Sequence, residues 1–346
     1  MNHELIMQLH ATIPVKNPTI KDIIDGQSPD GKTVLDLVNL LSQENPFMED
    51  AVVRECNQND QHTEVVMTSM PTIKKRKYNE GVKSSKGTRA KLTDATSIYT
   101  ARCAVDKDLA SLNGGTREFL MRENEVFLDA MAQSVATDVI YGAQAAGNNG
   151  LIGFAERYST LTRKNPDGNL PETADYIIDA GGTGNDLTSL WFVVWGLKTC
   201  FMIYPKGSKA GLEVEPTYLG DAYDENGDPY RAHITNYNHK VGLCVKDLRS
   251  VVRIANIDTE ALAADADKAK LVKFMVDGFV KLKNKKSGKL VIYCNDAVYA
   301  HLWKMAIDRG NVDFAVTEIE GKPMATFQGY PIKCCDAIIS TEAQVV

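Results

Sequence analysis

Two strand patterns, a long basic segment between them and a long helix pattern after them occupy residues 61–142 of this chain. The segments 62–70 and 91–103 are rich in Thr, Val and Ile, which favour β-strands. About 20 polar and basic residues separate them, and loops of that length are usually functional or disordered. This order predicts a long arm next to a rigid helix, which is typical of a protein that reaches another molecule.

The segment between the two strand patterns is strongly basic. Residues 74–91 contain eight basic residues and one acid, Glu80, so this segment carries +7 and the remainder −13 within the net charge of −6. The basic residues are Lys74, Lys75, Arg76, Lys77, Lys83, Lys86, Arg89 and Lys91. Three interpretations stay open: a solvated loop, a nucleic-acid contact, or an arm laid over an acidic neighbouring copy. The acidic remainder favours the third.

The strongest helix pattern spans residues 117–141. Leu128, Met131, Val135 and Val139 follow a 3-4-4 spacing, so they share one face, and Gly142 is expected to end the helix. A helix of this length rises about 37 Å, which is enough to act as a beam across a subunit.

The other segments predict a mixture of strands and helices. Residues 1–58 contain several prolines and are expected to form an extended arm with one short helix near residues 34–41. A buried strand is predicted at 191–204, one or two long strands at 239–257 and a strand at 290–293. A closing hairpin is predicted at 313–319 and 324–339, and helices are predicted at 260–283 and 296–309. There is no regular βαβ alternation, which indicates an α+β fold and argues against a dinucleotide-binding fold.

Composition excludes several classes of protein. No apolar run approaches the roughly 18 residues of a membrane helix, and the first residues show no signal-peptide pattern. The seven cysteines are scattered and odd in number, which predicts free thiols in a reducing compartment. We therefore expect no membrane contact.

Two short patterns resemble ligand-binding loops. The glycine cluster at 181–184 lacks the Gly-Lys-Ser/Thr ending of a phosphate-binding loop. The acidic segment 224–228 starts like a calcium loop, but Pro229 stands where that loop needs Gly, and Thr235 where it needs Glu. Both are better explained as loops or turns.

The remaining candidates for chemistry are cysteines, histidines and tryptophans. Cys334 and Cys335 are adjacent, so on a strand they point to opposite faces, and no metal-binding spacing is present. The histidines are dispersed, and Trp191 and Trp195 lie in a dense apolar run that predicts core packing over base stacking. We predict no catalytic residue, no metal site and no cofactor.

Seven short segments carry a family resemblance: 122–128, 150–153, 204–208, 241–247, 251–257, 291–296 and 329–332. Together with the order of an arm, a long two-stranded loop and a long helix, they resemble the major capsid proteins of tailed bacteriophages. The resemblance is to the Hong Kong ninety-seven type of shell fold, and to short-tailed phages in particular.

The resemblance implies an α+β capsid fold in four parts. These are an N-terminal arm (1–58), an extended loop (59–103) with its basic tip (74–91), a peripheral domain (104–258) with the spine helix 117–141, and an axial domain (259–346). In the usual family order, the axial segment precedes the long peripheral strands. Here 241–257, which looks like those strands, comes first, so the resemblance implies a permuted connectivity.

The same resemblance implies a structural role, not an enzymatic one. The chain is expected to self-assemble into pentamers and hexamers of an icosahedral phage head around double-stranded DNA, with the eight basic tip residues contacting an adjacent subunit. Expected partners are further copies, scaffolding, portal and cement proteins, and packaged DNA on the inner face. The expected location is the virion, after assembly in the host bacterial cytoplasm. Two alternatives are an encapsulin-like nanocompartment shell and a nucleic-acid-binding protein that uses the basic hairpin.

Overall fold

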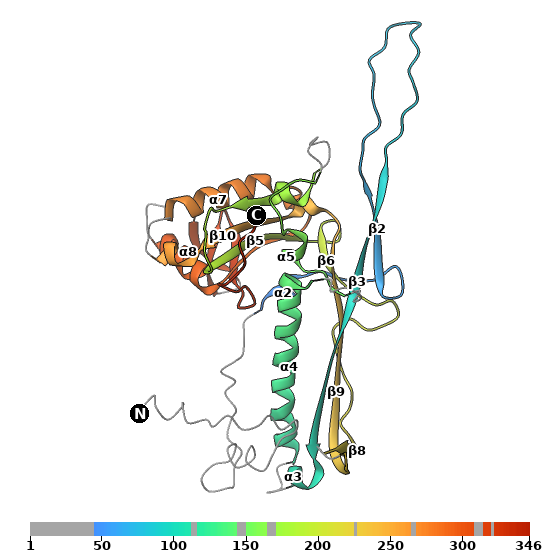
Figure 1. Ribbon diagram of the computed structural model, residues 1–346, viewed down its shortest axis with the longest axis vertical. Helices are drawn as coiled ribbons and strands as arrows, with labels where there is room; N and C mark the ends of the chain where they lie inside the picture. The colour runs from blue at the N-terminus through green and yellow to red at the C-terminus, as the bar shows by residue number, and fades with distance from the viewer. Residues whose placement is uncertain are drawn as a thin grey trace. The chain divides into compact units, whose positions relative to one another are not determined.

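The chain divides into two compact units (Figure 1). The computed structural model describes residues 45–111, 116–143, 150–164, 171–224, 227–263, 268–307, 314–319 and 322–346. The large unit comprises residues 43–98, 132–211 and 240–346, and the small unit comprises 1–42, 99–131 and 212–239. The short helix predicted near residues 34–41 lies outside the described residues.

A mixed β-sheet forms the centre of the large unit (Figure 1). Strand β5 (Leu187–Trp195) pairs antiparallel with β10 (Val251–Asp258) on one side and with β11 (Lys289–Cys294) on the other. Beyond β10 lies β4 (Ile177–Asp179). Beyond β11 lie β14 (Tyr330–Cys334), β13 (Lys322–Phe327) and β12 (Phe314–Ile319). Every residue of β5 is buried, which fits its central position between β10 and β11.

Two helices cover parts of this sheet. Helix α7 (Lys268–Lys281) packs on β10 and β4, and α8 (Asp296–Ile307) packs on β12, β13 and β14. The helix predicted at 260–283 appears as α6 (Thr259–Ala263) and α7, with residues 264–267 outside the description. The helix predicted at 296–309 is present as α8.

The other elements of the large unit are short or continue into the small unit. Strand β1 (Val53–Glu55) pairs parallel with β6 (Cys200–Tyr204), and β2 (Gln61–Met67) pairs antiparallel with β3 (Arg89–Asp106). The short helices are α2 (Phe47–Asp50), α5 (Phe154–Arg157) and the 3₁₀ turns Thr173–Tyr176, Leu248–Ser250 and Lys285–Ser287.

The prediction of one strand at 191–204 is wrong. Strand β5 ends at Trp195 and β6 begins at Cys200, with a tight turn between them. The Gly196 N–H donates to the Cys200 carbonyl at 2.8 Å, and the Thr199 N–H donates to the Gly196 carbonyl at 3.0 Å. A Cβ at Gly196 would lie 2.8 Å from the Ser287 carbonyl oxygen, so the turn requires glycine at this position.

The single strand predicted at 324–339 is also divided. Strands β13 and β14 pair antiparallel, with Phe327 opposite Tyr330. The two residues between them, Gln328 and Gly329, have φ angles of 49° and 82°, as a two-residue hairpin turn requires. The Gln-Gly pair is a weaker turn signal than Asn-Gly, which explains why the turn was not predicted.

The small unit is built on three elements that it shares with the large unit. Helix α4 (Thr116–Tyr141) confirms the predicted helix. Of the one or two strands predicted at 239–257, the structure has two, β9 (Pro229–Val245) and β10. Strands β7 (Leu212–Val214) and β8 (Tyr218–Tyr223) both pair antiparallel with β9, and α3 (Lys107–Ser111) follows β3.

The core of the small unit is formed by one face of α4 and the adjoining strands. Met131 is buried with Cys103, Val105 and Tyr237, and the ring of Phe127 stacks on that of Tyr237 with centroids 6.0 Å apart. On the same helix, Val135 and Val139 are buried in the large unit. The 3-4-4 spacing therefore predicted the buried face.

Gly142 ends α4 as predicted, and the reason is that a side chain would not fit at this position. Its N–H donates to the Asp138 carbonyl at 2.8 Å, and its carbonyl accepts from the Gly153 N–H at 2.7 Å. A Cβ at Gly142 would lie 2.5 Å from the Asp138 oxygen and 2.9 Å from the Leu151 oxygen. Close packing of two backbone segments, not a left-handed conformation, selects glycine here.

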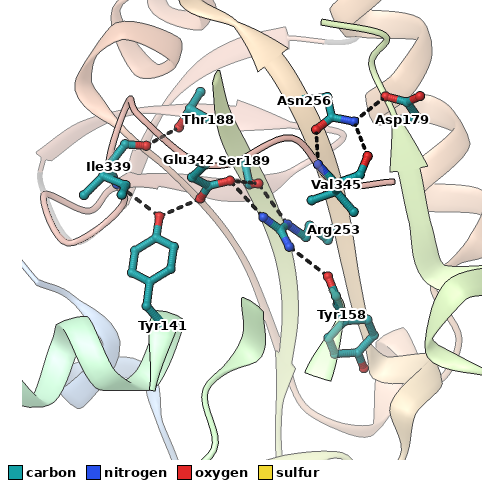
Figure 2. A network of polar contacts seen from close by, with 10 residues as sticks. All are labelled: Tyr141, Tyr158, Asp179, Thr188, Ser189, Arg253, Asn256, Ile339, Glu342 and Val345. Carbon is teal, nitrogen blue, oxygen red and sulfur yellow. Dashed lines mark hydrogen bonds and ion pairs between the residues drawn. The ribbon is translucent and has the colours of Figure 1, made fainter. Parts of the chain in front are cut away.

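A buried polar network holds the last residues of the chain against the central sheet (Figure 2). The Arg253 guanidinium on β10 donates to Glu342 Oε2 at 2.9 Å, to Ser189 Oγ at 2.9 Å and to the Tyr158 carbonyl at 2.8 Å. The Tyr141 hydroxyl donates to Glu342 Oε1 at 2.5 Å. The Arg253 and Glu342 side chains are each only 4% exposed, so these contacts compensate for the desolvation of both charges.

A second part of this network fixes the backbone near the C-terminus. Asn256 Nδ2 donates to the Val345 carbonyl at 2.9 Å, and the Val345 N–H donates to Asn256 Oδ1 at 2.8 Å (Figure 2). Asn256 adopts a φ of 59° at an irregularity in the pairing of β10 with β5. Asparagine tolerates this conformation better than most residues.

The predicted boundary between residues 258 and 259 stays a prediction. Strands β5 and β10 precede it in the chain and β11 and β14 follow it, yet all four belong to the same sheet. Within the residues described above, no helix is both long enough and apolar enough to cross a membrane.

Candidate assembly site

The basic segment forms the outer part of a long hairpin (Figure 1). Strands β2 and β3 pair from Gln61 opposite Ala95 to Met67 opposite Arg89. Residues 68–88 connect them with a backbone that is mostly irregular and forms a turn at 78–79. The strands predicted at 62–70 and 91–103 are therefore confirmed, with shifted ends.

Hydroxyl side chains tie together the two limbs of the hairpin beyond the last strand pair. The Thr68 N–H donates to the Thr88 carbonyl at 2.9 Å, and their hydroxyl oxygens are 2.8 Å apart. Ser69 Oγ accepts from the Thr88 N–H at 2.9 Å. Farther out, Ser85 Oγ accepts from the Thr72 N–H and donates to the Thr72 carbonyl, both at 3.0 Å. The extended loop is thus a two-limbed arm with internal bonds along its length.

A single acid organises the outermost turn. The Glu80 carboxylate accepts from Lys74 Nζ at 2.5 Å and from the Lys77 N–H at 3.1 Å, and the Glu80 carbonyl accepts from Arg76 at 3.3 Å. Asn79 adopts a φ of 64°, which reverses the chain between them. Bonding to Lys74, and then to the Lys77 backbone, lowers the pKa of the Glu80 carboxyl below its ordinary value. We call these Glu80 contacts the tip clamp.

All eight predicted basic residues are exposed on this hairpin. Lys74 and Arg76 take part in the tip clamp, and Arg89 and Lys91 lie at the start of β3. Within the described part of the chain, no ion pair is found for the side chains of Lys75, Lys77, Lys83, Lys86, Arg89 or Lys91. The tip therefore presents several solvated positive charges on an ordered backbone.

Large apolar side chains are exposed among these charges. Tyr78 is 100% exposed at the outermost turn, Ile73 is 92% exposed and Met70 is 80% exposed. Single exposed apolar residues are common, but a group of them on one projection marks an interaction surface. Tyrosine in particular is frequent among the residues that dominate protein–protein binding.

A buried ion pair anchors the base of the hairpin in the large unit. Arg157 Nη2 donates to Asp94 on β3 at 2.7 Å and to the Leu243 carbonyl at 3.0 Å, and Arg157 Nε donates to the Ile152 carbonyl at 3.1 Å. The Asp94 side chain is only 2% exposed. Because the Arg157 guanidinium on α5 binds three other parts of the chain, Asp94 on β3 has a fixed position relative to β9 and α5.

A second, half-buried group of charges lies on β2. Glu64 contacts Lys246 Nζ at 2.9 Å and His62 Nε2 at 3.2 Å. Burial raises the pKa of the Glu64 carboxyl, but hydrogen bonds from Lys246 and His62 outweigh it, so the pKa lies below its ordinary value. The hairpin thus combines a rigid base with an exposed, charged tip.

Sequence reasoning missed three residues of this site. Glu80 was recognised only as the one acid in a basic segment, and no role was predicted for Tyr78. The partner of Asp94 could not be predicted, because Arg157 lies 63 residues away and outside any motif. The symmetric Thr and Ser residues on both sides of the tip were the one available signal for cross-limb bonding.

The glycine cluster, the cysteines and the tryptophans singled out in the sequence have structural roles. In the glycine cluster, the Gly181 N–H donates to Asp179 and the Gly182 N–H to the Asn256 carbonyl, so these donors are used internally. All seven cysteines are free thiols, as predicted, and burial raises the pKa of Cys56 to about 11. Trp191 and Trp195 are buried in the core, as predicted.

Comparisons with known proteins identify the family. The family model of major capsid protein GP7 matches residues 28–346. A comparison with curated proteins finds no match. The near-atomic cryo-EM structure of bacteriophage epsilon15 is 30% identical, with a TM-score of 0.76, and the match covers 97% of this chain and 99% of that chain.

Two further structures are more distant. The bacteriophage JBD30 capsid is 8% identical with a TM-score of 0.47, over 97% of this chain and 99% of that chain. The SrpI encapsulin complex from Synechococcus elongatus is 8% identical with a TM-score of 0.39, over 75% of this chain and 96% of that chain.

The family match and the epsilon15 match both extend over most of the chain. They confirm the predicted resemblance and the predicted α+β capsid fold, and the family's role is structural, not enzymatic. The chain therefore belongs to the major capsid protein GP7 family, as a structural subunit of the multimeric capsid shell of a phage virion.

Proposed function

We propose that this capsid subunit assembles into pentamers and hexamers of an icosahedral head enclosing double-stranded DNA, and that its basic tip docks on an adjacent copy. The observation that carries the docking role is the exposed, internally bonded tip on an anchored base. The tip carries +7 and the remainder of the chain carries −13. Unlike charges on the two partners steer association and fix its register.

Preformed order makes such a contact efficient. The tip clamp and the cross-limb hydroxyl bonds hold the loop before it meets a partner, which reduces the entropy lost on docking. A single exposed ion pair stabilises by only about 0–1 kcal/mol. A closed symmetric assembly repeats each weak contact many times, so the sum holds the shell together.

The other parts of the chain receive proposed roles from the family. The arm (1–58) clasps a neighbour, the peripheral domain (104–258) forms the long body, and the axial domain (259–346) surrounds the local symmetry axes. Within the arm, Asp50 is buried and accepts from Lys289, Lys333 and Tyr293 at 2.7–2.8 Å. These contacts anchor Asp50, in the described part of the arm, to β11 and β14. Assembly in the host cytoplasm, scaffolding, portal and cement partners, and DNA at the inner face complete the proposal.

Charge reversal at the tip tests the docking role. Replacing Lys74, Lys75, Arg76 and Lys77 with Glu should leave the subunit folded but prevent closed shells, because the reversed tip repels an acidic neighbour. The assembled fraction is measured by sedimentation and electron microscopy, with a scaffolding protein supplied if the wild type needs one. The double variant Lys198→Glu/Lys273→Glu, at exposed sites away from the loop, is the control. Normal particles from the tip variant would disprove docking through these charges.

A further inference from the structure

The small unit carries a surface whose charge is opposite to that of the tip. The described residues 212–224 and 227–228, which include β7 and β8, contain five acidic residues and no basic residue. Glu213 and Glu215 are exposed, as is every residue from 212 to 219, and Asp228 is exposed immediately before β9. We call residues 212–224 and 227–228 the acidic hairpin edge.

Apolar side chains are exposed on the same surface. They are Leu212, Val214, Tyr218, Leu219 and Tyr223, with exposed fractions between 40% and 65%. The acidic hairpin edge thus combines one sign of charge with exposed aliphatic and aromatic groups. The tip combines the other sign with exposed Tyr78 and Val82, and Met70 and Ile73 are exposed just before it on the same hairpin. Matched apolar groups surrounded by opposite charges are the composition of a protein–protein interface.

The strand edge at this surface is open. Strands β7 and β8 pair with β9 along one side, and no described strand pairs with the opposite side of β8. Native proteins usually protect such edges, because the unpaired backbone groups invite another strand. Glu213 and Asp228 also form no ion pair with any described residue, whereas Asp221 is paired with Arg231 at 2.9 Å.

We infer that the tip of one copy docks on the acidic hairpin edge of a second copy. The inference rests on the proposed docking function and names its receptor. Each copy carries one tip and one receptor edge at different places in the sequence, so the contact is head-to-tail. Such contacts close into rings when the rotation between copies closes. The exposed apolar groups on both surfaces favour a protein partner over a nucleic acid, which the acidic edge repels.

A charge-swap cycle tests this pairing directly. The tip variant Lys75→Glu/Lys77→Glu keeps both side chains of the Lys74–Glu80 pair, so the tip clamp is retained. The receptor variant is Glu213→Lys/Asp228→Lys. Each alone should lower the assembled fraction by about tenfold or more, and the combination should recover most of it, because opposite charges meet again. The variant Glu156→Lys/Asp277→Lys, at exposed sites elsewhere, should assemble normally.

The cycle separates the receptor assignment from the docking function. If the receptor variant assembles normally while the tip variant fails, this receptor is wrong and docking of the tip still stands. If both variants fail and their combination stays defective, direct pairing of the tip with the acidic hairpin edge is wrong. If the tip variant and the four-fold tip reversal both assemble normally, the docking function itself is wrong. Far-ultraviolet circular dichroism and the melting temperature of unassembled subunits show that each variant is folded.

Discussion

At the scale of single residues, the buried Arg253–Glu342 pair makes the large unit sensitive to a single substitution. Its Glu342 oxygens also accept from Ser189 and Tyr141, so removing the carboxylate leaves a guanidinium in the interior without its counter-charge. Glu342→Gln should reduce the free energy of unfolding by about 3–5 kcal/mol. Urea titration of unassembled subunits measures this loss.

A surface pair provides the control for that prediction. Glu49 lies 3.9 Å from Lys333 and its side chain is 80% exposed, so Glu49→Gln should cost at most about 1 kcal/mol. Equal losses in the two variants would show that the Arg253–Glu342 pair contributes no more than a surface ion pair.

The same pair shows where residue-level prediction ends. The sequence predicted one or two strands over 239–257, and Arg253 does lie in a buried strand, β10. Its partner lies 89 residues farther along, in a final segment without a strand or helix pattern. Periodicity indicates which face of an element is buried, but it carries no information on contacts between distant segments.

At the scale of elements, the extended loop depends on the tip clamp for its order. Hydrogen bonds from Lys74 and the Lys77 backbone hold the Glu80 pKa below its ordinary value, so the clamp is complete above the ordinary carboxyl pKa. As the pH falls through the lowered pKa, protonation removes the clamp. Amide hydrogen exchange in residues 74–80 should therefore accelerate relative to the intrinsic rate.

The variant Glu80→Gln isolates that titration. Its exchange rates in residues 74–80, corrected for intrinsic rates, should be high and independent of pH, while β2 and β3 stay protected because their pairing does not involve Glu80. If the variant and the wild type exchange alike near neutral pH, the clamp does not order the turn.

Local composition predicted this hairpin and the helix after it, but not every turn. Thr, Val and Ile identified β2 and β3, and the 3-4-4 spacing identified the buried face of α4. The turns at Gly196 and at Gln328–Gly329 were missed, because each depends on one or two residues within a continuous apolar or strand-like run. A single glycine is ambiguous until its tertiary neighbours are known.

At the scale of the whole molecule, the uneven charge distribution predicts how assembly responds to salt. The +7 tip and the −13 remainder attract each other between copies, while the overall charge of −6 makes whole subunits repel. The screening length falls from about 30 Å at about 0.01 M salt to about 3 Å at about 1 M salt, so salt weakens both effects. The salt dependence of wild-type assembly therefore combines two opposing effects, a weaker attraction at the tip and a weaker repulsion between whole subunits.

Comparison with the Lys75→Glu/Lys77→Glu variant separates these responses. That variant keeps the repulsion between subunits but loses much of the tip attraction, so added salt should improve its assembly. In the wild type, salt also screens the attraction between the tip and the neighbouring copy. This loss should offset the gain, so the assembled fraction should rise less than in the variant, or fall. Light scattering at a series of salt concentrations measures both curves at equal subunit concentration. Parallel curves would mean that tip charges do not act between copies, and the shell would then depend on its apolar contacts.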